Sequence, residues 1–196
     1  MYCAFPEQPE LLVDTHVHTQ YSDGIAGVPR IEQFCRDRGL GIAVTDHNEI
    51  RGSTNMYERE RAPVVPGIEV GTEEGVDFLV YFSSAAALED FYIDAVEPFL
   101  RTRFMVRSWI RSERCLGVAK EMGGYVSLAH PFALGRKSLD YQHGHRGTSF
   151  VRTIMGGVDA IELHNGGVPK KANFKAHRYA ERCGKRLTVG SDSHRL

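Results

Sequence analysis

Short apolar runs of β type alternate along the chain with stretches of helical periodicity. The runs predict strands at 11–15, 41–45, 64–69, 76–82, 125–129, 158–163 and 187–191. Helical spacing predicts helices at 28–38 and 169–183 and a helical region at 85–122, with an open segment at 48–63 and a long loop from Phe132 to Gly147. Strands that alternate with helices in this way are typical of an α/β fold with mostly parallel strands.

Polar clusters follow most of these strands at the point where each ends. They are His16-Val17-His18, Asp23, Asp46-His47, Glu69, His130 and Asp192-Ser193-His194. Since the carboxyl ends of parallel strands meet at one edge of a sheet, these side chains are expected to converge. Taken singly, each cluster has another interpretation, such as a surface histidine pair, a turn or a helix cap. Taken together, imidazoles and carboxylates predict a site for zinc, manganese or iron.

These motifs resemble those of the PHP domain, of the polymerase and histidinol phosphatase superfamily. They read Asp14-Thr-His-Val-His18, Ser22-Asp-Gly24, Thr45-Asp-His-Asn48, Gly67-Ile-Glu69, His130-Pro131 and Gly190-Ser-Asp-Ser-His194. The resemblance spans nearly the whole chain. It implies a distorted seven-stranded (β/α)7 barrel, two or three divalent ions (Mn, Zn or Fe) at the C-terminal ends of the strands, and hydrolysis of phosphate esters.

The resemblance also implies ligand sets. It assigns one ion to His16, His18, Glu69 and Asp192, a second to Asp23, His47 and His194, and a third to the bridging Glu69 with His130. Many relatives supply a histidine from the fourth strand for the third ion. Asp77 stands nearest to that position here, which makes the site richer in oxygen.

The expected reaction is hydrolysis of a small phosphomonoester by a metal-bound hydroxide. Asp192, His194 and His18 are the candidates for proton handling. Asp14 and Asp46 are expected to orient metal-bound histidines. The sequence contains no Gly-x-Ser-x-Gly elbow, Walker loop or dinucleotide-binding glycine motif, so nothing in it indicates a serine nucleophile or a nucleotide cofactor.

Cationic residues after His130 are the candidates for holding the phosphate. Arg136, Lys137 and Arg146 lie in the predicted loop, and a flexible solvated loop is the other interpretation. Glu162 and His164 are expected to point to one face of their strand, where His164 would contact substrate. The doublet at His143 and His145 is an improbable metal site because it lies among glycines.

Three alternatives stay open. A phosphodiesterase or exonuclease would use the helical arginines Arg101, Arg103, Arg107, Arg111 and Arg114. A non-catalytic PHP module would have lost ligands, whereas this chain retains nearly all of them. An amidohydrolase shares the His-x-His start, but Glu69 and Asp192-Ser-His194 fit a phosphoesterase better.

Composition agrees with one globular domain over 1–196: 42% of the 196 residues are hydrophobic and 25% are charged. The formal net charge of −1 gives no general attraction to nucleic acid or to an anionic membrane. Four cysteines without Cys-x-x-Cys spacing indicate reduced thiols. With no signal-like or membrane-spanning run in the sequence, a cytoplasmic location is expected.

A closing helix is expected after the last strand of such a barrel but is not seen in the sequence. We therefore expect an exposed apolar patch beside Leu187 to Val189, covered by a further C-terminal segment or by another chain in a homo-oligomer.

Overall fold

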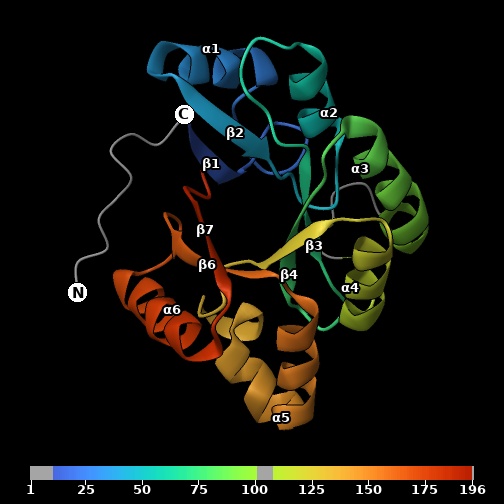
Figure 1. The fold of residues 1–196 in the computed structure, drawn as a ribbon, viewed down its shortest axis with the longest axis vertical. Coiled ribbons are helices and arrows are strands. Elements are labelled where there is room, and N and C mark those ends of the chain that lie inside the picture. The colour runs from blue at the N-terminus through green and yellow to red at the C-terminus, as the bar shows by residue number, and fades with distance from the viewer. Residues whose placement is uncertain (1–10, 101–107, 196) are drawn as a thin grey trace.

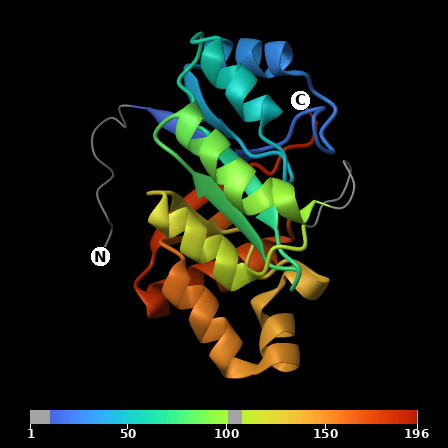
Figure 2. The ribbon, with the colours of Figure 1, turned by 90° about the vertical axis from the view of Figure 1, so that its right-hand side faces the viewer.

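The computed structural model describes residues 11–100 and 108–195, in which seven strands alternate with helices. The strands are β1 (Leu12–Val17), β2 (Leu40–Val44), β3 (Gly67–Gly71), β4 (Asp77–Tyr81), β5 (Tyr125–Leu128), β6 (Ala160–Asn165) and β7 (Arg186–Gly190). The helices are α1 (Val28–Arg38), α2 (Arg51–Glu58), α3 (Ala85–Phe91), α4 (Ser112–Glu121), α5 (Leu139–Gly157) and α6 (Lys170–Cys183). They lie around the outside of the strands (Figure 1). In the view turned by 90°, α1 and α2 lie at one end of the molecule and α5 at the other (Figure 2).

The strands form two sheets rather than one closed barrel. β1 pairs with β2, and a second sheet has the order β3-β4-β5-β6-β7. Only isolated bridges join the sheets, at Val17 with Ser193, Ile42 with Val64 and His47 with Glu69. The predicted α/β class is confirmed, whereas a continuous seven-stranded barrel is not observed.

Strand β4 runs antiparallel to both neighbours and is the exception in a sheet expected to be mostly parallel. The turn between β3 and β4 is too short for a crossover, so it closes a hairpin. Thr72 donates its backbone N–H to Val76 O, and Gly75 has a φ of 89°. The reversal places Asp77, the first residue of β4, at the end of the sheet where the parallel strands finish.

Apolar side chains pack the helices onto both sheets. Ile31 of α1 and Met56 of α2 pack with Val44 of β2, while Phe78 of β4 packs with Phe91 of α3 in the larger core. Burial of this apolar surface fixes the strands that carry the polar rim.

Two segments predicted to be irregular contain helix. Helix α2 lies in the segment 48–63 expected to be open, and α5 begins at Leu139 within the predicted loop Phe132–Gly147. Ser138 caps α5 by accepting a hydrogen bond from Asp140 N. The glycines that suggested a loop mark a kink instead, at Gly147 with a φ of 81°. Of the predicted arginine stripe, Arg101, Arg103 and Arg107 lie outside the described residues.

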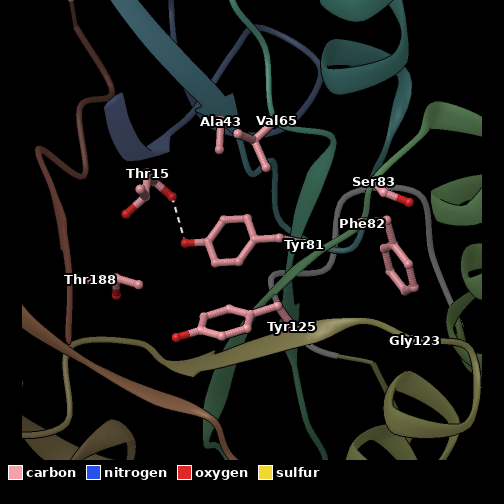
Figure 3. Close-up of a pocket in the computed structure, with 9 residues that line it drawn as sticks. All are labelled: Thr15, Ala43, Val65, Tyr81, Phe82, Ser83, Gly123, Tyr125 and Thr188. Carbon is pink, nitrogen blue, oxygen red and sulfur yellow. Dashed lines mark hydrogen bonds between the residues drawn. The ribbon is translucent and has the colours of Figure 1, made fainter. Parts of the chain in front are cut away.

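A cavity of about 410 Å³ lies between the two sheets at the end opposite Asp77. Tyr81 and Tyr125 line it, and the Tyr81 hydroxyl donates to Thr15 O at 2.8 Å (Figure 3). The apolar lining separates this end of the sheets from the polar rim.

The outer side of β7 is exposed, with Leu187 and Val189 half accessible to solvent. This confirms the expected apolar patch, while its association with another segment or chain stays a prediction. None of the helices in the described ranges has the length and apolar character needed to cross a bilayer.

Gly190 allows β7 to approach β1 closely. A Cβ at this position would lie 2.3 Å from His16 Cβ and 3.0 Å from Glu162 Oε1. We expect Gly190→Ala to lower the free energy of unfolding by roughly 1–3 kcal/mol, because the strands would have to separate. Urea denaturation measures the change.

Gly117→Ala is the matched control, since a Cβ there meets nothing within 4 Å. This change in α4 is expected to be neutral or to stabilise by up to about 1 kcal/mol. Equal stability of the two variants would contradict a close approach at Gly190.

Candidate metal centre

The end of β1 brings two histidines into the interior. His16 and His18 are 0% and 1% exposed, and their Nε2 atoms lie 3.1 Å apart. Both rings face the same side although the β1–β2 register shifts between Asp14 and Val17. Two ring nitrogens this close are well suited to sharing a cation.

Glu69 of β3 lies at the centre of four imidazoles. Its Oε2 is 3.3 Å from His16 Nε2, 3.4 Å from His18 Nε2 and 3.0 Å from His47 Nδ1. Its Oε1 is 3.0 Å from His130 Nε2. Glu69 is fully buried, so the imidazoles are its immediate electrostatic environment.

All nine predicted ligands belong to overlapping groups whose candidate donor atoms lie within 4.8 Å of one another. The groups are His18, Asp23, His47 and His194; His16, His18 and Glu69; His16, His130 and Asp192; and Glu69, Asp77 and His130. The sequence prediction that these side chains converge is therefore confirmed, while their role as ligands remains a proposal.

The first of these groups faces solvent. Asp23 Oδ1 is 3.2 Å from His194 Nε2, and Asp23 Oδ2 is 3.6 Å from His47 Nε2. The side chains of Asp23 and His194 are 44% and 36% exposed, in contrast to the buried Glu69. This side of the centre is open to solvent.

Asp46 and Asp14 shape the backbone around the centre rather than orienting a histidine ring. Asp46 accepts hydrogen bonds from Thr19 N, Thr19 Oγ1 and Ser22 Oγ, which fix the loop leading to Asp23. Asp14 accepts from Ser191 N and His16 N. The predicted contact of either carboxylate with a ring is not found.

Glu162 of β6 orients the His16 ring instead and also holds the backbone at His130. Its Oε1 lies 2.9 Å from His16 Nδ1, and its Oε2 accepts from His130 N at 2.6 Å. Asn165 was missed by sequence analysis; its Nδ2 donates to Glu162 Oε2 and to Asp192 Oδ2. These bonds link the ligands of β1, β5 and β7 through a single strand.

His164 does not share a face with Glu162, contrary to the sequence expectation. The β6–β7 register shifts between these two residues, so the i, i+2 rule fails there. His164 is exposed and lines a separate cavity with Lys170, Phe174 and His177.

The predicted phosphate-binding cations separate into two places. Lys137 reaches the centre, with Nζ 2.6 Å from Asp77 Oδ2. Arg136 and Arg146 line a different polar pocket of about 300 Å³ with Glu73 and Glu74, and none of the nine predicted ligands lines it. His145 stacks on Tyr141 with ring centroids 3.7 Å apart, away from the predicted ligands.

Three rim residues adopt left-handed backbone conformations that non-glycine residues seldom occupy. The φ angles are 49° at Asn48, 24° at His130 and 51° at Asp192. All three follow a strand; His130 and Asp192 belong to the groups of candidate donors, and Asn48 accepts a hydrogen bond from Gly71 N. Such backbone strain is typical of a functional site.

Carboxylates raise the pKa of most of the imidazoles. Burial disfavours a charged His16 ring, but Glu162 and Glu69 outweigh it and raise the pKa of His16 well above its usual value. The hydrogen bond that the His194 ring donates to Asp23 raises the pKa of His194 to about 9. Conversely, burial opposes ionisation of Asp23, yet His194 and His47 lower the pKa of Asp23 to about 2.

Burial and the charge of Glu69 also have opposite effects on the pKa values of the other rings that face this carboxylate. Burial disfavours charged His47 and His130, yet Glu69 raises the pKa of each. For His18, burial prevails and the pKa is lowered. Burial also opposes ionisation of Glu69, but His47 and His16 hold its pKa well below the usual range.

The residues fit a group of divalent ions. His18 Nδ1 and His130 Nδ1 are buried without a hydrogen-bond partner. Buried polar atoms rarely lack partners, and each of these nitrogens has a lone pair for a metal when the ring is neutral and its proton is on Nε2. The mixed imidazole and carboxylate donors suit zinc, manganese or iron.

We expect Glu162→Gln to weaken Mn²⁺ binding by roughly 10- to 100-fold, because the charged partner of His16 is lost. Titration calorimetry on metal-free protein measures the affinity. Glu181→Gln, which alters an exposed carboxylate near His177, is the control and should leave the affinity unchanged. Equal affinities in both variants would contradict an orienting role for Glu162.

We also expect Mn²⁺ binding to release protons, because rings with raised pKa values must become neutral to bind metal. Affinity should therefore fall as the pH is lowered from about 8 to about 6. Calorimetry in two buffers of different ionisation enthalpy measures the protons released. Binding heats that do not depend on the buffer would contradict this.

Protonation of the imidazoles with raised pKa values also stabilises the metal-free fold. The contribution of His194 is complete below its ordinary pKa of 6.5 and is lost as the pH rises through about 9.

Comparison with known proteins supports the fold. No family model matches the chain. An uncharacterized protein of Methanocaldococcus jannaschii is 26% identical over 185 residues, covering 93% of this chain and 65% of that protein. The chain thus spans less than two thirds of that relative's length.

Two solved structures resemble this chain over most of the length of both proteins. A candidate metal-dependent phosphoesterase of Bifidobacterium adolescentis has a TM-score of 0.66 at 19% identity, covering 96% of this chain and 89% of that one. An amidohydrolase of Chromobacterium violaceum has a TM-score of 0.70 at 16% identity, with 93% and 87% covered.

Two longer proteins share the fold over about half their length. The lesion-specific endonuclease Q of Pyrococcus furiosus has a TM-score of 0.69 at 17% identity, covering 94% of this chain and 48% of that one. A two-domain protein of Bacteroides vulgatus containing a predicted PHP-like metal-dependent phosphoesterase has a TM-score of 0.62 at 18% identity, with 94% and 52% covered. The chain therefore has the fold of the PHP-like metal-dependent phosphoesterases.

Proposed function

We propose that this chain is a PHP-type, metal-dependent phosphoesterase that hydrolyses a small phosphomonoester. The observation that supports it best is the buried carboxylate Glu69 among four imidazoles, beside the open pair Asp23 and His194. A structural role alone does not account for so many ionisable groups in one place.

The metal ions would be held by His16, His18, Asp23, His47, Glu69, Asp77, His130, Asp192 and His194. When bound, divalent ions lower the pKa of water towards neutrality and neutralise phosphoryl oxygens. The rigid strands place these donors before substrate arrives, which limits the reorganisation needed during the reaction.

The open side of the centre suggests the residues that handle protons. His194 is partly exposed and contacts Asp23, so when its ring does not bind metal a proton on it is accessible to a leaving alcohol oxygen. Asp192 Oδ1 lies 3.1 Å from His18 Nε2, which couples the protonation of these two groups. Lys137, the cation that reaches the centre, supplies positive charge for a phosphate group.

Phosphodiester cleavage is the second candidate, because endonuclease Q shares the fold. Arg111 and Arg114, the described members of the arginine stripe, pair with Glu74 and stack over Phe99. Neither arginine pairs with one of the nine proposed ligands, which favours the smaller substrate.

We expect Mn²⁺-reconstituted protein to release phosphate from at least one member of a panel of sugar, nucleotide and amino-alcohol phosphates. The double change His16→Ala and His18→Ala should lower the rate by more than about 100-fold. Loss of two metal ligands should cost more than loss of a residue that only hydrogen-bonds to a ligand, such as Glu162. Phosphate release and elemental analysis measure activity and bound metal.

His177→Ala, an exposed histidine on α6, is the matched control and should retain full activity. Activity that survives the double change would refute the metal site. Cleavage of an oligonucleotide without release of phosphate from any monoester would favour the phosphodiesterase instead.

A further inference from the structure

The ammonium of Lys137 lies against a carboxylate of the centre. Its Nζ is 2.6 Å from Asp77 Oδ2, and the Asp77 side chain is 1% exposed. Among the described residues, no other Lys or Arg lies within ion-pair distance of any of the nine proposed ligands. Lys137 is thus the one fixed cation that the described chain supplies to this cluster.

The backbone holds Lys137 in this position. It ends a single 3₁₀ turn, Gly135–Lys137, immediately before the cap of α5. The buried Gln142 donates from Nε2 to both Arg136 O and Glu74 O, which ties the turn to the β3–β4 hairpin. The hairpin also carries Asp77, so both partners of the ion pair belong to one connected unit.

The position of Lys137 overlaps a possible cation site. Asp77, Glu69 and His130 form one of the groups that could hold a metal ion. His130 Nε2 is 3.0 Å from Glu69 Oε1 and 3.7 Å from Asp77 Oδ2, the oxygen that the ammonium contacts. A divalent ion bound to that oxygen would lie beside the ammonium, and the two positive charges would repel each other next to a carboxylate that is 1% exposed.

We propose that the ammonium of Lys137 takes the place of a third divalent ion, so that the loaded centre holds two ions and Asp77 binds the ammonium rather than a metal ion. This inference rests on the proposed function and adds the number of ions to it. A lysine ammonium is a compact point charge with three donors, which suits a carboxylate-lined position. The third position would then stay positively charged whatever the metal supply.

The test counts bound ions rather than activity. Metal-free wild-type protein and variants are brought to equilibrium by dialysis against a fixed, saturating Mn²⁺ concentration, and elemental analysis gives ions per chain. We expect two for wild type and three for Lys137→Met, in which the side chain keeps its length but loses its charge.

Three further variants separate charge from shape. Lys137→Arg keeps the charge and should bind two ions. The double variant Lys137→Met with Asp77→Asn lacks the carboxylate and should return to two. Lys175→Met removes an exposed lysine that pairs with Asp140 on the surface, and it should match wild type. Lys137→Gln replaces Lys137→Met if the latter does not fold by circular dichroism.

Three ions in wild type, or no added ion in the neutral Lys137 variants, would overturn the proposal. Wild type that binds two ions but hydrolyses no phosphate ester would refute the proposed function and leave the ion count intact. Wild type that binds no ion would overturn both.

Discussion

The burial of one charged carboxylate constrains the rest of this structure. Glu69 is fully buried on β3, and isolated charge at such a position is costly unless it is compensated. Compensation comes from four histidines on three other segments, which meet at Glu69 only if their strands end at the same level. The strand order, the β3–β4 hairpin and the close approach of β7 to β1 at Gly190 all help to bring the strand ends to this level. The stability of the fold therefore depends on the charge compensation within the site.

The reversed strand β4 shows how the constraint is met where a parallel strand is missing. A parallel strand would bring its last residue to the rim, and β4 brings its first, Asp77. The short turn after β3 enforces this direction, and the ion pair with Lys137 then compensates the buried carboxylate. One hairpin thus supplies both Glu69 and Asp77 to neighbouring positions in the centre.

Most of the centre could be predicted from sequence because it depends on strand ends. Apolar runs followed by His16, Glu69 or Asp192 are local patterns, and the sheet brings them together. What failed depends on register and turns. The register shift within β6 turns the His164 side chain towards solvent and the Asn165 side chain inward. No local sequence pattern indicates such a bulge. The glycines before Gly147 indicated a loop, but the cap at Ser138 starts a helix that tolerates them.

Protons and divalent ions compete for the imidazole nitrogens of the centre. The raised pKa of His16 and of His194 means that protons neutralise the carboxylates when ions are absent, so the donors can stay assembled without metal. Divalent ions then replace protons on rings already in place, and little folding free energy needs to be spent on binding. The opposite holds for small domains whose folding requires the metal. Because Glu162 and Asn165 fix the donors through backbone and side-chain bonds, ion exchange should leave the strands unmoved.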